Sequence, residues 1–233
     1  MIPRQKELFK NIVLEHIKTA QPVGSKLIVA KYHMGISSAT VRNDMAELED
    51  LGLITQPYTS AGRIPTEYGY KYFVENYVDL KKELNQKEKN EIIKLINNNR
   101  EAWQRRAIAE KIKLFARILS SKSGLMVFAG FGKNDFYYTG LSNLFSQPEF
   151  QNLDLICNLS QIIDRLDEVI FEIYDIINKN DGVAVGIGKD NPFGDACSSI
   201  MRKVKDVLIG ILGPMRMDYE RNASLVNFAK AVI

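Results

Sequence analysis

Residues 37–63 read SSATVRNDMAELEDLGLITQPYTSAGR, and this stretch decides the fold of the N-terminal part of the chain. Apolar residues with the spacing of one buried helix face occur at Val41, Met45, Leu48 and Leu51. Ser37 or Ser38 can cap the start of that helix, and Gly52 suits the left-handed turn at its end. A short strand and a small polar loop ending at Arg63 follow, so the stretch predicts a capped helix and one arm of a hairpin.

The flanking sequence supplies the remaining elements of a small domain. A helix with regular apolar spacing is expected over residues 4–19, and a second one, capped by Ser25, over residues 26–33. Residues 53–56 and 63–65 predict the two arms of the hairpin, and Thr66 can cap a fourth helix rich in tyrosine. The order helix, helix, helix, hairpin, helix predicts a winged helix-turn-helix.

The exposed side of the third helix predicts a surface that reads double-stranded DNA. Arg42 can make a bidentate contact to guanine, and Asn43 can make one to adenine. The N-termini of helices and the hydroxyl groups of serine and threonine suit contacts to phosphate. Arg63, at the end of a small-residue wing, suits a narrow minor groove. The candidate DNA-binding residues are Ser25, Lys26, Ser37, Ser38, Thr40, Arg42, Asn43, Glu47, Tyr58, Ser60 and Arg63. The alternatives are a winged helix that mediates only protein contacts and a wing that is a plain tight hairpin.

The rest of the chain predicts an α+β protein of three segments. Residues 1–78 are the winged-helix domain, and residues 79–123 are a charged helical linker that contributes to dimer packing. In residues 124–233, hairpin-forming strands near 125–131, 136–139, 182–188 and 204–212 alternate with helices over 153–178 and after Asp218. That pattern indicates an antiparallel sheet with helices.

Charge is distributed unevenly among these segments. Lys and Arg outnumber Asp and Glu by 9 to 8 in residues 1–77 and by 12 to 6 in residues 78–123, but are outnumbered 10 to 14 in residues 124–233. The predicted DNA-reading segment is thus almost neutral, although attraction to phosphate grows with positive charge. Such a reader must place its cations on one face or act as a dimer.

Other chemistries find little support in the sequence. No apolar run approaches the length of a membrane span and the N-terminus is not a signal peptide, so we expect a cytoplasmic protein. Cys157 and Cys197 are expected to be structural thiols, and His16 and His33 to be solvated or capping residues. The glycines of residues 182–189 do not fit a phosphate loop. We therefore expect no enzyme activity, no cofactor and no metal.

Residues 213–219, GPMRMDY, have two possible interpretations. The simpler one is a strand exit followed by a helix cap at Asp218. The other places Arg216 in a buried ion pair or an effector pocket. Spacing alone favours the simpler interpretation.

Three separated motifs resemble the HrcA family of bacterial heat-shock repressors. They lie at residues 21–66, from QPVGSK to SAGRIPT, at residues 140–150, GLSNLFSQPEF, and at residues 213–219. The resemblance covers nearly the whole chain. It implies a homodimeric repressor of chaperone genes that binds an inverted-repeat operator (CIRCE), needs the GroEL chaperonin for activity, and carries a GAF-like C-terminal domain.

One departure from that family affects the expected dimer. Family members usually carry roughly a hundred more residues, including a dimerisation insert, between the segments matching residues 125–131 and 140–150. We therefore expect a reduced GAF-like sheet and a dimer made by other surfaces. The candidates are the helical pair in residues 79–123 and the exposed face of the small sheet. Alternatives to the heat-shock repressor are a metabolite-responsive winged-helix regulator and a protein–protein adaptor.

Overall fold

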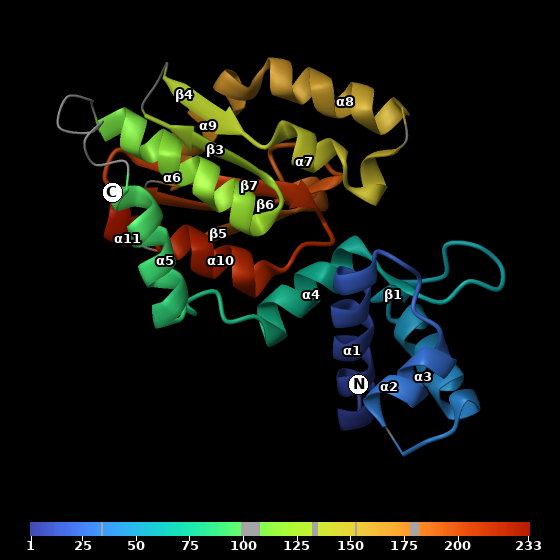
Figure 1. Ribbon diagram of the computed structural model, residues 1–233. Helices are drawn as coiled ribbons and strands as arrows, with labels where there is room; N and C mark the ends of the chain where they lie inside the picture. Colours follow the sequence, from blue (N-terminus) through green and yellow to red (C-terminus); the bar gives the residue numbers. More distant parts are fainter. Residues whose placement is uncertain (34, 99–107, 132–134, 152, 178–181) are drawn as a thin grey trace. The chain divides into compact units, whose positions relative to one another are not determined.

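The computed structural model of the protein describes residues 1–33, 35–98, 108–131, 135–151, 153–177 and 182–233. These residues form two compact units, Met1–Val78 and Asp79–Ile233. Figure 1 traces the chain from the N-terminus in blue to the C-terminus in red. Each unit has its own arrangement of helices and strands.

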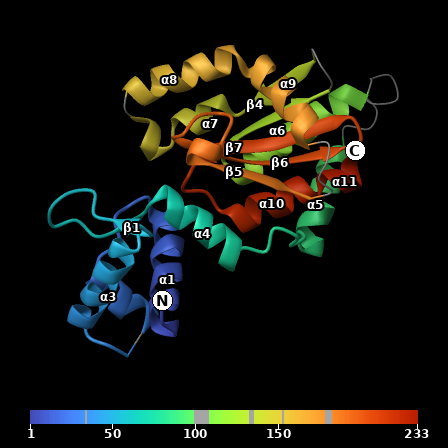
Figure 2. The same cartoon turned by 180° about the vertical axis from the view of Figure 1, so that it is seen from behind.

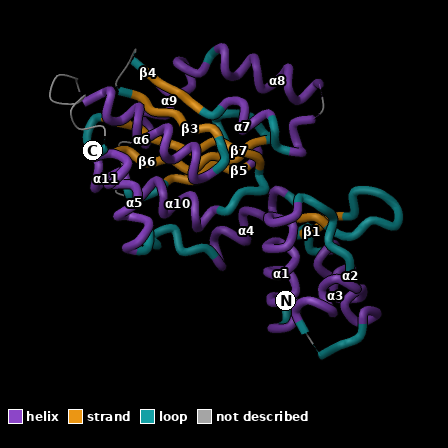
Figure 3. The backbone as a smooth tube through the Cα atoms, in the orientation of Figure 1, coloured by secondary structure: helices purple, strands orange, loops and turns teal. Residues whose placement is uncertain are grey.

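The first unit has three helices, a two-stranded hairpin and a fourth helix, in the predicted order. The elements are α1 (Pro3–Thr19), α2 (Ser25–Tyr32), α3 (Ser38–Asp50), β1 (Ile54–Thr55), β2 (Ile64–Pro65) and α4 (Glu67–Tyr77). The strands pair antiparallel, with Ile54 opposite Pro65. In Figure 3, the loop between them extends away from the helices of this unit.

The first unit encloses a small apolar core. Fully buried side chains come from α1, α2 and α3, namely Leu8, Phe9, Ile12, Val13, Ile28, Val41 and Leu48. On the α4 side, Phe9 packs against the rings of Tyr72 and Tyr77 at centroid distances of 5.7 and 6.3 Å. Edge-to-face and tilted ring contacts of this kind add to the stabilisation from burial.

Three predicted caps are confirmed, and one is wrong. Ser37 accepts a hydrogen bond from the Thr40 amide, and Thr66 accepts one from the Gly69 amide. Asp218 accepts one from the Arg221 amide at the start of α10. Ser25 is instead the first residue of α2, with Gly24 at the N-cap position. Its hydroxyl accepts a hydrogen bond from an arginine of α3.

The two histidines differ from one another. His33 ends α2 with a positive φ of 47° and is exposed, as a capping residue should be. His16 was expected to be solvated or capping, but its Nδ1 lies 2.6 Å from the hydroxyl of the buried Tyr70. That contact joins α1 to α4, which sequence spacing alone does not reveal.

The second unit is built on a five-stranded antiparallel sheet with the order β4-β3-β7-β6-β5. The strands are β3 (Met126–Gly130), β4 (Phe136–Thr139), β5 (Ala184–Ile187), β6 (Cys197–Val204) and β7 (Val207–Pro214). The helices are α5 (Gln86–Asn97), α6 (Ile108–Ser123), α7 (Leu141–Phe145), α8 (Leu153–Asp164), α9 (Leu166–Ile177), α10 (Tyr219–Asn227) and α11 (Ala229–Val232). Short 3-10 turns span Pro148–Gln151 and Gly188–Asp190. The predicted α+β class is confirmed, and the arrangement is consistent with a GAF-like domain.

Helices cover both faces of this sheet. Figures 1 and 2, seen from opposite sides, show α6 and α9 on opposite faces. Met126 and Phe128 pack toward α9 in the larger core, whereas Ala129 packs with Ile112 of α6. Alternate residues of β3 therefore serve the two faces, as the two-residue period of a strand requires.

The sequence interpretation missed one strand of this sheet. It placed a single strand over Val204 and residues 207–212, but β6 and β7 are two paired strands joined at Lys205, which has a φ of 52°. Because β6 contains several polar residues, its sequence lacks the apolar pattern that predicts a strand. Ser198, Ser199 and Arg202 are all buried there, and Ser198 and Ser199 hydrogen-bond to Tyr219 and Asn191.

Other boundaries were close to the expected ones. The helical stretch over residues 153–178 is two helices that meet at Arg165, and the final helix is interrupted at Phe228. The helix expected from Glu101 is described only from Ile108 onward. The expected turn at Lys133 and Asn134 lies outside the described residues.

The two cysteines were expected to be structural thiols. Cys197 is buried in the core, and this burial raises the pKa of its thiol to about 12, so it stays protonated. The side chain of Cys157 lies outside the described part.

Among the described residues, no helix combines the length and apolar character that crossing a bilayer requires.

Candidate nucleic-acid interface

The start of α3 presents a row of exposed polar side chains. Arg42, Asn43 and Glu47 are exposed, whereas Val41, Met45 and Leu48 on the other side are buried. Ser37 caps the helix, and its hydroxyl also lies 3.0 Å from that of Thr40. The cap uses two of the predicted residues to hold the leading turn in place.

Two polar contacts fix α3 against α1. Arg4 donates two hydrogen bonds to the buried carboxylate of Asp44, from Nε to Oδ2 at 2.7 Å and from Nη2 to Oδ1 at 2.8 Å. Gln5 donates to the carboxylate of Glu47. A bidentate arginine–carboxylate pair fixes orientation as well as distance. The exposed face of α3 is therefore held at a defined angle, and Glu47 is partly engaged in that support.

Helix α2 approaches α3 at its own first turn. The hydroxyl of Ser25 is 3.3 Å from Nε of Arg42, which donates to it. Ser25 is only 8% exposed, so it is better placed to orient Arg42 than to meet a ligand itself. Lys26, the next residue, is exposed.

The loop between β1 and β2 is shaped by close backbone packing. A Cβ atom on Gly62 would lie 2.4 Å from the carbonyl carbon of Val23, so only glycine fits there. Val23 and Arg63 exchange two backbone hydrogen bonds of 2.9 Å, which tie the hairpin to the loop before α2. Tyr58 is 65% exposed, and Ser60 is exposed with a φ of 70°. The tip is thus small and accessible.

Glu49 organises the base of this loop, and sequence reasoning missed it. Its Oε2 lies 2.9 Å from Nη2 of Arg63, and its Oε1 accepts the backbone N–H of Gln56 at 3.0 Å. Gln56 in turn donates to the Ala61 carbonyl at 3.0 Å. In the sequence Glu49 is one acid of an ordinary charged helix, and no spacing signal could have singled it out.

Five of the eleven predicted residues line one hollow. The hollow has a volume of about 450 Å³, and its predicted lining residues are Ser25, Lys26, Arg42, Ser60 and Arg63. Ser37, Ser38, Thr40, Asn43, Glu47 and Tyr58 are not among its lining residues. Within the described residues, Nε of Arg63 is a buried donor with no hydrogen-bond partner. Lys26 and Arg63 beside a hollow of this size suit an anionic group such as a backbone phosphate, although Arg63 also contacts Glu49.

No metal site is found in the part of the chain that the structure describes. No group of three or more His, Cys, Asp or Glu side chains there is arranged to hold an ion. The chemistry available at α3 and the wing is hydrogen bonding and charge.

The fold and this site together define a two-unit α+β protein whose smaller unit presents an exposed polar helix beside a cationic hollow. The profile of the HrcA protein C-terminal domain matches residues 71–222. Since that match covers more than half of the chain, the chain belongs to the HrcA family.

Two relatives illustrate the extent of the similarity. Heat-inducible transcription repressor HrcA of Pseudarthrobacter chlorophenolicus is 50% identical over 97 residues, which are 42% of this chain and 28% of the relative. The protein of the same name from Carboxydothermus hydrogenoformans is 27% identical over 325 residues, covering 97% of this chain and 95% of the relative. The second alignment is longer than the 233-residue chain itself, so the relative has a long segment that this chain lacks.

A solved structure supports the fold. The crystal structure of a hypothetical protein at 2.2 Å resolution superposes with a TM-score of 0.71 and 17% sequence identity, covering 99% of this chain and 97% of that one. At that identity, the likeness concerns the fold alone.

Proposed function

We propose that residues 1–78 form a winged helix-turn-helix domain that reads double-stranded DNA with the start of α3. The observation that carries this proposal is the exposed polar face of α3, whose opposite face is locked to α1 by the Arg4–Asp44 pair. A helix held in this way and exposed at its N-terminal end is the geometry with which helix-turn-helix proteins enter a major groove.

The site residues divide into two roles in this proposal. Arg42 and Asn43 contact base edges, and Ser25 orients Arg42 through the hydrogen bond between them. Contacts to the sugar-phosphate backbone come from Lys26, Ser37, Ser38, Thr40, Tyr58, Ser60 and Arg63, with Glu47 at the edge of the base-reading row. Backbone contacts set the register, and base contacts set the specificity.

Membership of the HrcA family extends the proposal to the whole chain. The chain represses transcription of heat-shock chaperone genes by binding an inverted-repeat CIRCE-type operator as a cytoplasmic homodimer, and its activity depends on the GroEL chaperonin. In this proposal residues 79–123 contribute to the dimer and residues 124–233 form the reduced GAF-like domain. A DNA-reading segment with 9 basic and 8 acidic residues gains little from bulk charge, which supports binding as a dimer to two half-sites.

The dimer offers a route to heat induction. A dimer lacking the usual insert buries less surface and dissociates with warming and dilution, because association depends on protomer concentration. Sedimentation at low and heat-shock temperatures tests this step. A tight dimer at both temperatures would exclude it, without affecting DNA recognition.

Fluorescence anisotropy with a labelled inverted-repeat duplex tests DNA reading directly. We expect Arg42→Ala to weaken binding about 5- to 150-fold, since one bidentate base contact is worth about 1–3 kcal/mol. The matched control is Lys6→Ala, an exposed cation of α1 outside the site, which should bind as the parent does. Equal affinity for scrambled DNA would refute sequence-specific binding, and salt-independent binding would favour a protein–protein adaptor.

A second candidate function is regulation by a small molecule. It is favoured by one observation, a pocket in the second unit of a size that suits a metabolite. In this alternative the chain is a winged-helix regulator whose GAF-like domain binds the effector.

A further inference from the structure

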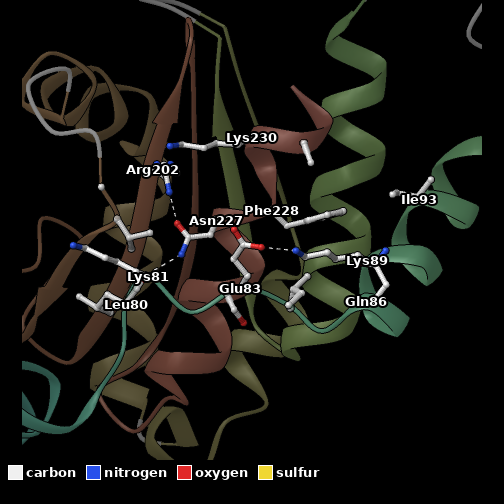
Figure 4. Close-up of a pocket in the computed structure, with 15 residues that line it drawn as sticks. Leu80, Lys81, Glu83, Gln86, Lys89, Ile93, Arg202, Asn227, Phe228 and Lys230 are labelled. Atoms are coloured by element: carbon white, nitrogen blue, oxygen red, sulfur yellow. Dashed lines mark hydrogen bonds and ion pairs between the residues drawn. The ribbon is translucent and has the colours of Figure 1, made fainter.

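A pocket of about 550 Å³ lies wholly within the second unit (Figure 4). One wall is the chain segment from Leu80 to Gln86, which follows α4 in the sequence. The opposite walls are α5, the junction of α10 with α11, Val183 just before β5, and Arg202 of β6. Pockets of about 300–1,000 Å³ are the size that binds small organic ligands.

One side of the pocket is built around a buried arginine. Arg202 is 7% exposed, and its Nη1 donates to the side-chain oxygen of Asn227. The Asn227 amide donates in turn to the Leu80 carbonyl at 2.9 Å. Figure 4 shows Lys230 extending toward this arginine side. Asn227 thus fixes both the guanidinium and the wall that faces it.

The other side of the pocket is apolar. Leu84 and Phe228 are 5% and 7% exposed, and Phe228 is held by a ring contact with Phe115 of α6 at 6.4 Å. Ile93 of α5 remains 42% exposed although it lines the pocket. These side chains give this side of the pocket an apolar lining.

The charges of the lining favour an anion. Among the described lining residues, four are cationic, namely Lys81, Lys89, Arg202 and Lys230. The same residues include a single carboxylate, that of Glu83, which is paired with Lys89 at 2.5 Å. Arginine recognises carboxylate or phosphate oxygens with paired hydrogen bonds.

We propose that this pocket binds a small organic anion with an apolar body. The acidic group lies on the side of Arg202 and Lys230, and the body lies against Leu84, Ile93 and Phe228. The proposal names a ligand class and a site, and it stands independently of DNA binding because neither the pocket nor its test involves the first unit.

Calorimetric titration of the full chain with octanoate tests the charge requirement. Octanol is the matched neutral probe, with the same apolar body. We expect one octanoate site per chain and at least tenfold weaker binding of octanol, together with displacement of the fluorescent anion 8-anilinonaphthalene-1-sulfonate by octanoate. Binding of neither anion, or equal binding of octanol and octanoate, would overturn the proposal.

Paired variants then locate the site. Ile93→Asp should weaken octanoate at least tenfold, whereas Leu95→Asp on the same helix should not, since Leu95 is 46% exposed and does not line the pocket. Lys230→Gln should weaken octanoate severalfold, whereas Lys94→Gln should leave it unchanged. All four positions are exposed, so each variant can be made without opening the core. Unchanged binding in both Ile93→Asp and Lys230→Gln would place the anion elsewhere and refute the assignment.

Discussion

The guanidinium of Arg63 and the carboxylate of Glu49 lie 2.9 Å apart, at the base of the loop between β1 and β2. The second oxygen of Glu49 holds the Gln56 amide, so one side chain supports both arms of the hairpin. This pair places an acid beside the cation that we propose contacts DNA.

Glu49→Gln separates these two roles. The glutamine amide oxygen can still accept the hydrogen bond from the Gln56 N–H. The neutral side chain, however, no longer attracts Arg63 or repels phosphate. We expect severalfold tighter binding to any duplex and a salt dependence steeper by about one counterion, measured by anisotropy at several salt concentrations. Arg63→Ala should act in the opposite direction. Weaker binding by Glu49→Gln at unchanged stability would contradict this account.

Gly62→Ala should disturb the wing. The new Cβ would meet backbone atoms of Val23 at 2.4–2.5 Å, and backbone cannot move aside as a flexible side chain can. We expect DNA affinity to fall several-fold and the unfolding midpoint of the first unit to drop. Gly24→Ala is the control, because a Cβ there meets nothing within 4 Å although Gly24 lines the same hollow. Similar behaviour of the two variants would show that the wing is not held by this packing.

Glu15 should make the first unit sensitive to acid. It accepts hydrogen bonds from Lys31 and Tyr32 of α2, and the hydrogen bond from Lys31 holds its pKa below the ordinary value of 4.5. The unfolded chain therefore binds the proton more readily, so this stabilisation is present above about pH 4.5 and is lost as pH falls through the lower folded value. Burial raises the pKa of Tyr32 to about 12, so its hydroxyl stays protonated as a donor.

Urea denaturation at pH 7 and at pH 3.5 measures the effect. The parent should lose more stability between these two pH values than Glu15→Gln, which cannot titrate at this position. An equal loss in both proteins would show that Glu15 does not contribute.

Arg216→Gln should destabilise the second unit. Nε of Arg216 contacts Glu149 at 2.5 Å and Nη2 contacts Gln147 at 3.0 Å, although these residues lie more than sixty positions away in the sequence. The arginine side chain is only 12% exposed, so losing it should cost about 1–3 kcal/mol of unfolding free energy. Arg165→Gln, which breaks the exposed pair with Glu168, should leave the thermal midpoint unchanged. Equal effects would mean that burial of the Arg216 pair adds nothing.

The Arg216 pair also shows how far spacing can be taken. The sequence favoured a strand exit and a helix cap for residues 213–219, and the cap at Asp218 is present. The ion pair is present as well, because the turn after β7 brings Arg216 to the segment after α7. No periodicity within residues 213–219 points to a partner in residues 147–149.

Local signals succeeded where neighbours in the sequence are neighbours in space. The spacing of Val41, Met45 and Leu48 predicted the buried face of α3, and Ser37 and Thr66 were correctly identified as caps. Leu51 was wrongly expected on the same face: it follows the last residue of α3 and is 52% exposed. The same reasoning failed for β6, whose buried serines hydrogen-bond to Tyr219 and Asn191, outside the strand. It also gave Ser25 a capping role, whereas its hydroxyl serves Arg42 across 17 positions.

By itself, the sequence determined the α+β class, the order of elements in residues 1–78 and the polar face of α3, because helix caps, periodicity and turn residues act over a few positions. Only the tertiary structure decided the Arg4–Asp44 lock, the support of the wing by Glu49, and the pocket between residues 80–93 and Arg202. Each of these joins groups that are not neighbours in sequence, and such contacts follow from how whole elements pack. The packing of whole elements therefore decides which residues hold α3 in place and which residues line the pocket.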